Sequence, residues 1–236
     1  LALILTSALV DFHVGARIHR ATDPRSRRRW LAVSLVSNLG LLAVFKYAPF
    51  AAENLGALLD GDPARWRLET WVVPVGISFY TFQTLSYSLD IHRGRLEPCR
   101  SFVDFFLFVS FYPQLVAGPI VRASELLPQF RARRRLLLPT VQIGAYYCVV
   151  GLFLKVVVAD NLARTVNRVY VLDGITERVP ADAWLATVYF GGQIYADFAG
   201  YSSIAIGLAY LLGLRFPRNF NSPYVSQSLS EFWSRW

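Results

Sequence analysis

The feature that most constrains this chain is a series of apolar runs. Several approach or exceed the ~18–20 residues that a helix needs to cross a bilayer. Hydrophobic residues make up 54% of the 236 positions, charged residues only 17%, and mean hydropathy is +0.37. A soluble domain of this length carries more charge and fewer long apolar runs. The composition therefore predicts an all-α, polytopic transmembrane protein.

The formal net charge of +8 does not indicate a nucleic-acid partner. The arginines lie in short loops between apolar runs, where they orient a membrane protein, and they do not form one basic face with interleaved aromatic residues. Cys99 and Cys148 offer neither a disulfide framework nor a metal-binding pair. We therefore expect membrane lipid around the protein, and neither a nucleic-acid partner nor a bound metal.

The chain contains no methionine and begins at Leu1, inside an apolar run that also holds an aspartate and a histidine. This beginning lacks the basic start and the small-residue cleavage site of a signal peptide. We find no internal repeat and no low-complexity linker. We therefore expect residues 1–236 to be a single transmembrane domain, an internal fragment of a longer protein truncated at both ends.

Basic loops give a first topology. The loop around residues 17–29 and the loop at 93–100 are rich in arginine and are expected in the cytoplasm. The connection between them, at residues 53–69, is acidic and suits the outer side. The expected apolar segments are 1–18, 30–52, 71–91, 101–120, 138–158 and 183–214.

Three of the later segments need a special interpretation. Segment 101–120 lies between two basic loops and contains the helix breakers Pro113 and Gly118-Pro119, so we expect a re-entrant or broken helix there. Residues 161–180 mix charge with apolar residues and are expected to form a short helix in the membrane interface. Segment 183–214 is too long for one straight span, which leaves either a tilted helix or two segments broken near Gly191-Gly192.

Small and polar residues recur every four positions along the last apolar segment. The small residues predict close packing of helices in lipid. The polar residues form a stripe whose aspartate is costly at membrane depth, which makes it a candidate functional residue; hydrogen bonding that holds helices together is the structural alternative. The small residues are Gly192, Ala196 and Gly200, with Ala199, Ser203 and Gly207; the polar ones are Gln193, Asp197 and Tyr201.

Hydroxyls in segment 71–91 are interpreted as interhelical hydrogen-bonding groups rather than substrate contacts. They are Thr81, Thr84 and Ser88. Lys46 and Lys155 lie near expected span ends, where lysines extend toward the interface. The histidines form no catalytic triad, and His13 has only Asp11 nearby in sequence. The residues alone therefore predict a multi-span membrane protein with a polar interior, either a transporter or an enzyme.

Five stretches, in order along the chain, resemble the membrane-bound O-acyltransferase family, in its bacterial alginate O-acetyltransferase branch. Each alone is a modest match, but together they cover most of the chain. They are VPVGISFYTFQ at residues 73–83, FYPQLVAGPIVR at 111–122, KVVVADN at 155–161, YADFAGYS at 195–202 continuing to NFNSPY at 219–224, and EFWSRW at 231–236.

The resemblance implies a reaction and a setting. A histidine deep in a membrane tunnel would act as general base on a substrate hydroxyl, which then attacks an acyl thioester. The implied reaction is O-acetylation of an exported polysaccharide such as alginate, at the inner membrane of a bacterium, together with partner acetylation proteins. No bound cofactor is expected; acetyl-CoA or a carrier-linked acyl group would serve as co-substrate.

The family's histidine directly follows the EFW-x-RW stretch, so here it is expected immediately after Trp236. No catalytic residue is therefore assigned within residues 1–236. The resemblance marks the approach to the site, and ordinary interface packing is the alternative for the residues of the tail. The candidates for lining a substrate tunnel are Asp197, Tyr201, Asn219, Asn221, Tyr224, Glu231, Trp233 and Trp236.

Two rival functions remain open. Related enzymes transfer D-alanine from a carrier protein to teichoic acid, which is again acyl transfer. A secondary transporter is the rival from another class, because broken helices and an intramembrane aspartate also occur in transporters. Inverted repeats would favour the transporter, and the sequence shows none.

Overall fold

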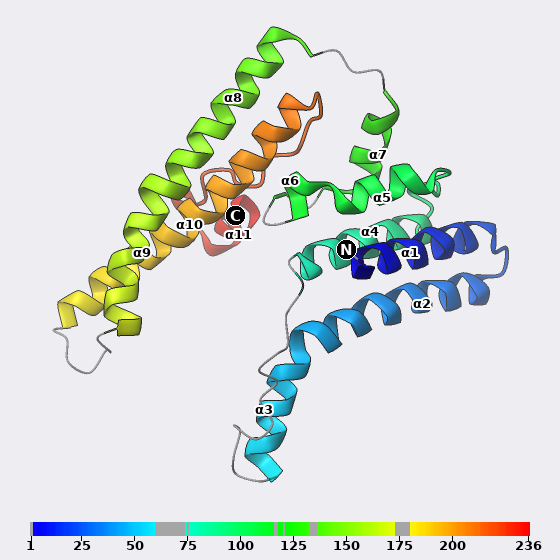
Figure 1. The fold of residues 1–236 in the computed structure, drawn as a ribbon, viewed down its shortest axis with the longest axis horizontal. Helices are drawn as coiled ribbons and strands as arrows, with labels where there is room; N and C mark the ends of the chain where they lie inside the picture. The colour runs from blue at the N-terminus through cyan, green and yellow to red at the C-terminus, as the bar shows by residue number, and fades with distance from the viewer. Residues whose placement is uncertain are drawn as a thin grey trace. The chain divides into compact units, whose positions relative to one another are not determined.

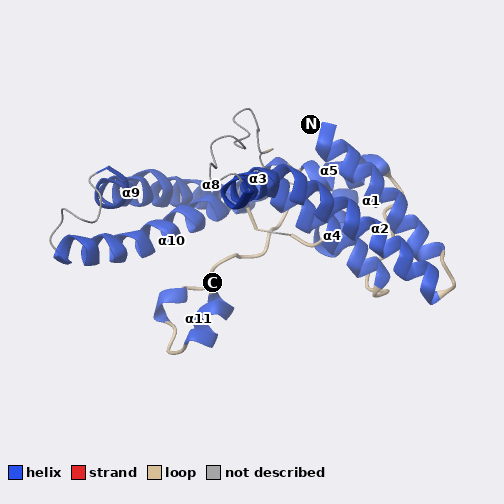
Figure 2. Ribbon diagram, turned by 90° about the horizontal axis from the view of Figure 1, so that it is seen from below, coloured by secondary structure: helices blue, strands red, loops and turns tan. Residues whose placement is uncertain are grey.

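The computed structural model describes residues 2–59, 74, 76–115, 118–119, 121–132, 136–172 and 180–236. Within these ranges every regular element is a helix and no strand occurs (Figure 2). The helices form two compact units. Unit 1 comprises Leu1–Val116 and Ile120–Ala132, and unit 2 comprises Ala117–Pro119 and Arg133–Trp236. The predicted all-α class is confirmed.

Three helices form the centre of unit 1, namely α1 (Ala2–Arg20), α2 (Pro24–Leu42) and α4 (Ile77–His92). They lie side by side in Figure 1, and each contacts the other two. The guanidinium of Arg27 donates hydrogen bonds to the carbonyls of Ile91, at 3.3 Å, and His92, at 2.9 Å. The start of α2 therefore caps the end of α4, where helix carbonyls lack partners.

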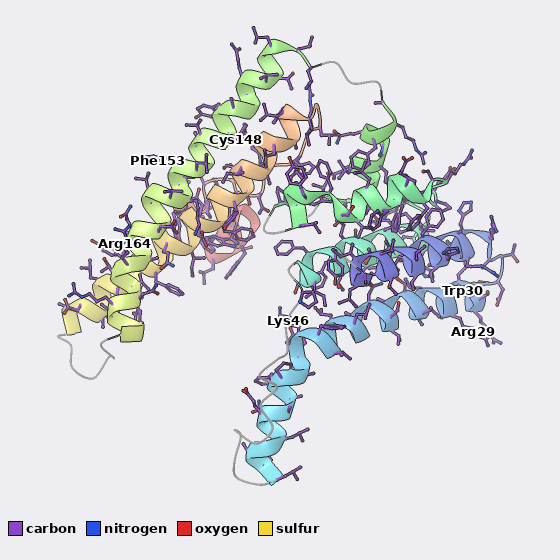
Figure 3. All side chains as sticks on the ribbon, viewed as in Figure 1. Arg29, Trp30, Lys46, Cys148, Phe153 and Arg164 are labelled. Atoms are coloured by element: carbon purple, nitrogen blue, oxygen red, sulfur yellow. The ribbon has the colours of Figure 1, made fainter. Side chains whose placement is uncertain are left out.

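A bend separates α2 from α3 (Ala48–Leu59), and Lys46 marks its place in Figure 3. The joining stretch Ala43–Tyr47 is π-helical. Pro49 explains the irregularity, because a proline inside a helix has no N–H to donate and its ring clashes with the preceding turn. Together these elements form the continuous helix Pro24–Leu59.

Segment 101–120 is broken as predicted, although the break precedes the proline. Helix α5 covers Phe102–Ser110 and α6 covers Tyr112–Leu115. Phe111 between them has extended backbone, and Pro113 then occupies the first turn of α6, where a missing N–H does no harm. Re-entry of this segment into a membrane stays a prediction. Helix α7 (Ala123–Arg131) completes unit 1.

In unit 2, one long helix runs from α8 (Leu138–Leu152) through the π-helical stretch η3 (Phe153–Ala159) into α9 (Asp160–Asn167) and η4 (Arg168–Leu172). Figure 1 shows it beside α10 (Pro180–Leu211), and α8 and α10 contact each other extensively.

The structure corrects one expectation for unit 2 and decides between two alternatives for another. Residues 161–172 continue the helix that begins at α8 and do not form a separate interface helix; residues 173–179 lie outside the described residues. Helix α10 runs unbroken through Gly191-Gly192, so the two-segment alternative fails. A Cβ at Gly192 would lie 3.3 Å from Cδ1 of Leu162, so packing against the neighbouring helix supports this glycine within α10.

Glycines bring α8 and α10 together, as the small-residue pattern predicted. A Cβ added to Gly151 would lie 2.6 Å from the carbonyl oxygen of Gly200. One added to Gly207 would lie 2.6 Å from the carbonyl oxygen of Gly144 and equally close to the sulfur of Cys148. No side chain fits at these contacts, so the backbones approach as closely as small-residue interfaces in membranes allow.

Two continuous helices among the described residues are long and apolar enough to cross a membrane. They are Pro24–Leu59, which contains an 18-residue stretch of mean hydropathy 1.6, and Leu138–Tyr170, which contains one of mean hydropathy 1.9. Exposed apolar side chains cover both; Val36 of α2 is 72% exposed and Val149 of α8 is 66% exposed. A surface of this kind suits lipid rather than water.

Candidate functional site

The predicted aspartate of α10 lies beside a lysine of the neighbouring helix. The ammonium of Lys155, in η3, is 2.8 Å from a carboxylate oxygen of Asp160 and 2.8 Å from one of Asp197. It also lies 5.6 Å from the ring centre of Tyr201, within reach of a cation–π interaction. Asp197 and Tyr201, two of the predicted candidates, therefore meet around one cation that the sequence did not connect with them.

This ion pair joins the two long helices of unit 2. The side chain of Lys155 is 27% exposed and that of Asp197 is 42% exposed, so the pair is only partly shielded from its surroundings. The arrangement matches the structural alternative for Asp197, in which its carboxylate holds helices together. A functional role for its charge stays a prediction.

A groove lies between α8, α10 and the chain that follows α10. It has a volume of about 340 Å³, and Tyr146, Tyr147 and Ser202 contribute to its walls. Asn219 donates a hydrogen bond of 2.9 Å from its amide to the hydroxyl of Ser202. Arg218 is the only charged residue among those lining the groove. The predicted candidate Asn219 therefore borders this groove of unit 2, whose other walls are mostly aliphatic and aromatic.

Aromatic rings pack the tail against α10. The rings of Tyr195 and Tyr224 lie 5.3 Å apart, and Trp236 lies 5.3 Å from Phe220 and 6.0 Å from Tyr195. The hydroxyl of Tyr224 donates to the carbonyl of Gly191 at 2.8 Å. Burial, with Tyr195 nearby, raises the pKa of Tyr224 above its ordinary value. Such edge-to-face clusters stabilise beyond their buried area.

The last helix, α11 (Leu229–Arg235), has its start fixed by two hydrogen bonds. The hydroxyl of Ser228 accepts from the backbone N–H of Glu231, whose carboxylate accepts from the N–H of Gln227 at 2.8 Å. The Glu231 carboxylate also pairs with Arg235 at 2.7 Å. The Gln227 amide and then Arg235 hold the pKa of Glu231 below its ordinary value.

A backbone hydrogen bond closes the tail on itself. The N–H of Asn221 donates to the carbonyl of Arg235 at 2.8 Å. Asn221, Tyr224, Glu231 and Trp236 are therefore brought together within one small folded segment. Trp233 is less enclosed than these residues. Its ring contacts Phe232, but its side chain is 69% exposed.

The sequence did not identify a buried polar network in unit 1. Asp11 of α1 is fully buried and accepts hydrogen bonds from the hydroxyls of Ser34 and Ser88 and, at 2.6 Å, from the amide of Asn38. Thr84 donates in turn to the amide oxygen of Asn38 at 3.0 Å. The interhelical role predicted for Thr84 and Ser88 is confirmed. It is wrong for Thr81, whose buried hydroxyl has no hydrogen-bond partner among the described residues. Asp11 within an apolar run was the available signal.

The two long apolar helices, the small-residue contact and the polar groups between helices are all typical of a helical membrane protein. The sequence profile of MBOAT, the membrane-bound O-acyltransferase family, matches residues 32–236. The chain belongs to this family.

Three curated relatives extend the comparison. The chain is 38% identical over its whole length to the "probable alginate O-acetylase AlgI" of Azotobacter vinelandii, covering 47% of that protein. It is 33% identical, again over its whole length, to the peptidoglycan O-acetyltransferase of Helicobacter pylori, covering 49%. A more distant relative is the teichoic acid D-alanyltransferase of Bacillus subtilis, 25% identical over 69% of this chain and covering 41% of the relative. The chain therefore spans a little under half the length of these relatives.

Proposed function

We propose that this chain is part of a membrane-bound O-acyltransferase that transfers an acetyl group to a hydroxyl of an exported polysaccharide. One observation carries the proposal. The whole chain is 38% identical to a probable alginate O-acetylase, and a second relative of similar coverage is also named as an O-acetyltransferase. Alginate is the polymer that these similarities favour.

The proposed chemistry needs a base and a dry site. A hydroxyl is a poor nucleophile at neutral pH until a positioned base takes its proton. Its oxygen then bonds to the acyl carbon, and the carbon–sulfur bond of a thioester donor breaks to release the thiol. Exclusion of water protects the donor from hydrolysis. The donor is acetyl-CoA or a carrier-linked acyl group.

We assign the base to a histidine that follows Trp236 in the longer protein. The assignment rests on the resemblance carried by the EFW-x-RW stretch, and two contacts within the tail would position such a residue. Trp236 packs against Tyr195 of α10, and Asn221 donates a hydrogen bond to the carbonyl of the preceding residue, Arg235. These contacts would give the next residue a defined starting point beside α10. General bases need such positioning before their pKa matters.

The proposed setting follows from the same family. The longer protein would reside in the inner membrane of a bacterium, take its donor from the cytoplasmic side and meet its polymer outside. Partner acetylation proteins would work beside it. D-alanine is the alternative acyl group, because the D-alanyltransferase relative is 25% identical to this chain over 69% of its length.

The test uses the longer protein in an alginate-producing bacterium whose own O-acetylase gene is deleted. Ester-linked acetyl on the secreted alginate is measured by NMR after expression of the wild type. The same measurement follows for a variant in which the residue after Trp236 is alanine. We expect acetylation with the wild type and a loss of at least ~100-fold with the variant, which is the lower end of a general base's contribution.

Other outcomes redirect or end the proposal. Wild-type protein that is present in the membrane but adds no acetyl to alginate excludes that polymer. Peptidoglycan and teichoic acid are then analysed for ester-linked acetyl and D-alanine. No ester on any of these polymers would contradict acyl transfer itself. A residue other than histidine after Trp236 would remove the proposed base.

A further inference from the structure

A basic pocket lies in unit 1. Its volume is about 620 Å³, within the range of about 300–1,000 Å³ that small-molecule pockets occupy. It is formed by the last turns of α1 and by residues Glu97–Arg100, in the loop that follows α4. Three arginines and two histidines line it against a single carboxylate, that of Glu97.

Helix geometry directs three of these side chains to one face. His13, Arg17 and Arg20 are four and then three residues apart on α1, so they share a side of that helix. Arg17 lies 5.4 Å from the ring centre of Trp30, which orients it. Neither Arg20 nor Arg100 forms an ion pair within the described part of the chain. These exposed guanidinium groups are therefore available to an anion.

The pocket also has an apolar side. Phe12 and Ala16 line it, and the ring of Phe12 lies 5.5 Å from that of Phe102 at the start of α5. Val103, next to Phe102 in sequence, is 73% exposed, and Leu9, three residues before Phe12 on α1, is 39% exposed. A cationic rim next to an exposed apolar flank matches a ligand that has an anionic head and hydrocarbon chains.

We propose that this pocket binds the phosphate headgroup of an anionic phospholipid in the cytoplasmic leaflet. The arginine-rich loops at residues 17–29 and 93–100 are both expected on the cytoplasmic side. Basic pockets between membrane helices on that side are suited to anionic headgroups, and arginine forks match phosphate oxygens. A soluble phosphate compound shares the headgroup chemistry, but it makes no use of the apolar flank.

Native mass spectrometry of the protein in neutral detergent tests the proposal, with phosphatidylglycerol and phosphatidylcholine as the lipids. We expect phosphatidylglycerol to bind and phosphatidylcholine not to bind. The double variant R20Q/R100Q should bind phosphatidylglycerol about 30-fold more weakly, which corresponds to about 1 kcal/mol for each lost charge. The matched control R28Q/R29Q removes two exposed arginines of α2 that do not line the pocket, and should bind as the wild type does.

Each alternative result is informative. Equal weakening in both double variants would mean a general surface attraction and would overturn the site. Coenzyme A or inorganic phosphate that binds with the same dependence on Arg20 and Arg100, and displaces the lipid, would overturn the lipid as occupant. If R20Q/R100Q fails to fold, the single variants R20Q and R100Q replace it. Each removes one charge and should bind phosphatidylglycerol about 5-fold more weakly, and unchanged binding in both folded single variants would contradict the headgroup site.

Discussion

Asp11 in unit 1 and Asp197 in unit 2 are both carboxylates between packed helices, and their surroundings differ in kind. Asp11 is fully buried and its oxygens meet hydroxyl and amide donors from two other helices. Asp197 is 42% exposed and meets the ammonium of Lys155. A charge attracts over a distance and tolerates small displacements, whereas neutral donors act only at short range and good angles.

The difference shows what fixes each unit. In unit 1, directional hydrogen bonds specify how three helices meet. In unit 2, the glycines of α8 and α10 specify the contact, and the ion pair of Lys155 adds to it. Unit 1 should therefore be more sensitive than unit 2 to loss of a polar group. Added volume should destabilise either unit at its close glycine contacts, which are Gly15 beside Tyr87 in unit 1 and Gly151 beside Gly200 in unit 2.

The largest expected effect follows from Asp11→Leu. The change leaves the donors of Ser34, Ser88 and Asn38 buried without their acceptor, and buried unsatisfied groups cost about 1–3 kcal/mol each. We expect the free energy of unfolding to fall by about 3 kcal/mol, measured by denaturant titration in detergent micelles. Asp104→Leu is the control, because this carboxylate pairs with Arg131 at 3.5 Å near the surface and should cost under about 1 kcal/mol.

A pair of identical substitutions tests the role of volume. Gly151→Ala places a Cβ 2.6 Å from the carbonyl of Gly200, and we expect a loss of about 2 kcal/mol, since overpacking costs about 1–3 kcal/mol. Gly40→Ala in α2 meets nothing within 4 Å, so it should stabilise by up to about 1 kcal/mol through helix propensity. The two melting temperatures should move in opposite directions. A shift of the same sign in both would contradict the close contact.

Loss of the ammonium should have a smaller effect. Lys155→Met removes the partner of Asp160 and Asp197, and partial exposure limits the expected loss to about 1 kcal/mol. The free energy of unfolding in detergent micelles, measured as for Asp11→Leu, gives the difference between variant and wild type. If Lys155→Met lowers the free energy of unfolding as much as Asp11→Leu does, the proposed difference between the surroundings of Asp11 and Asp197 is wrong.

Asp197→Asn separates the structural role of this pair from a functional one. Asparagine keeps the shape of the side chain and removes its charge. We expect acyl transfer by the longer protein to fall more than the yield of folded protein in the membrane, because the changed helix adjoins the tail. Polymer acetylation and detergent-extracted monomer are measured side by side. A proportional fall in both would leave Asp197 with a structural role alone.

The smallest effect concerns the carboxylate of Glu231, which adds a surface case to the comparison. Its pKa is lowered in the folded tail, so its stabilising contacts are present above its ordinary value of 4.5 and are lost as the pH falls through the lowered pKa. Intrinsic tryptophan fluorescence, to which Trp233 and Trp236 contribute, should therefore change at acidic pH. Glu231→Gln should show little of this change, and an unaltered titration in that variant would exclude Glu231 as its source.

Patterns local to one helix allowed good predictions. The four-residue spacing of small residues predicted the contact of α10 with another helix, and the hydroxyl of Thr84 was correctly interpreted as an interhelical donor. Partners distant in sequence were not predictable. Lys155 and Asp197 meet because two helices run side by side, and nothing in the local sequence of either residue contains that information. The network around Asp11 was not predicted either, because its members come from three helices distant in sequence.

The glycine contacts also determine how unit 2 can move. Gly144 lies opposite Gly207 and Gly151 lies opposite Gly200, so seven residues forward on α8 match seven residues back on α10. A slide of one helical turn, about 5.4 Å, would bring side chains against backbone at both places. The glycine contacts therefore fix the register of α8 against α10. Motion of this unit has to tilt the helix pair as a whole, because sliding is sterically blocked.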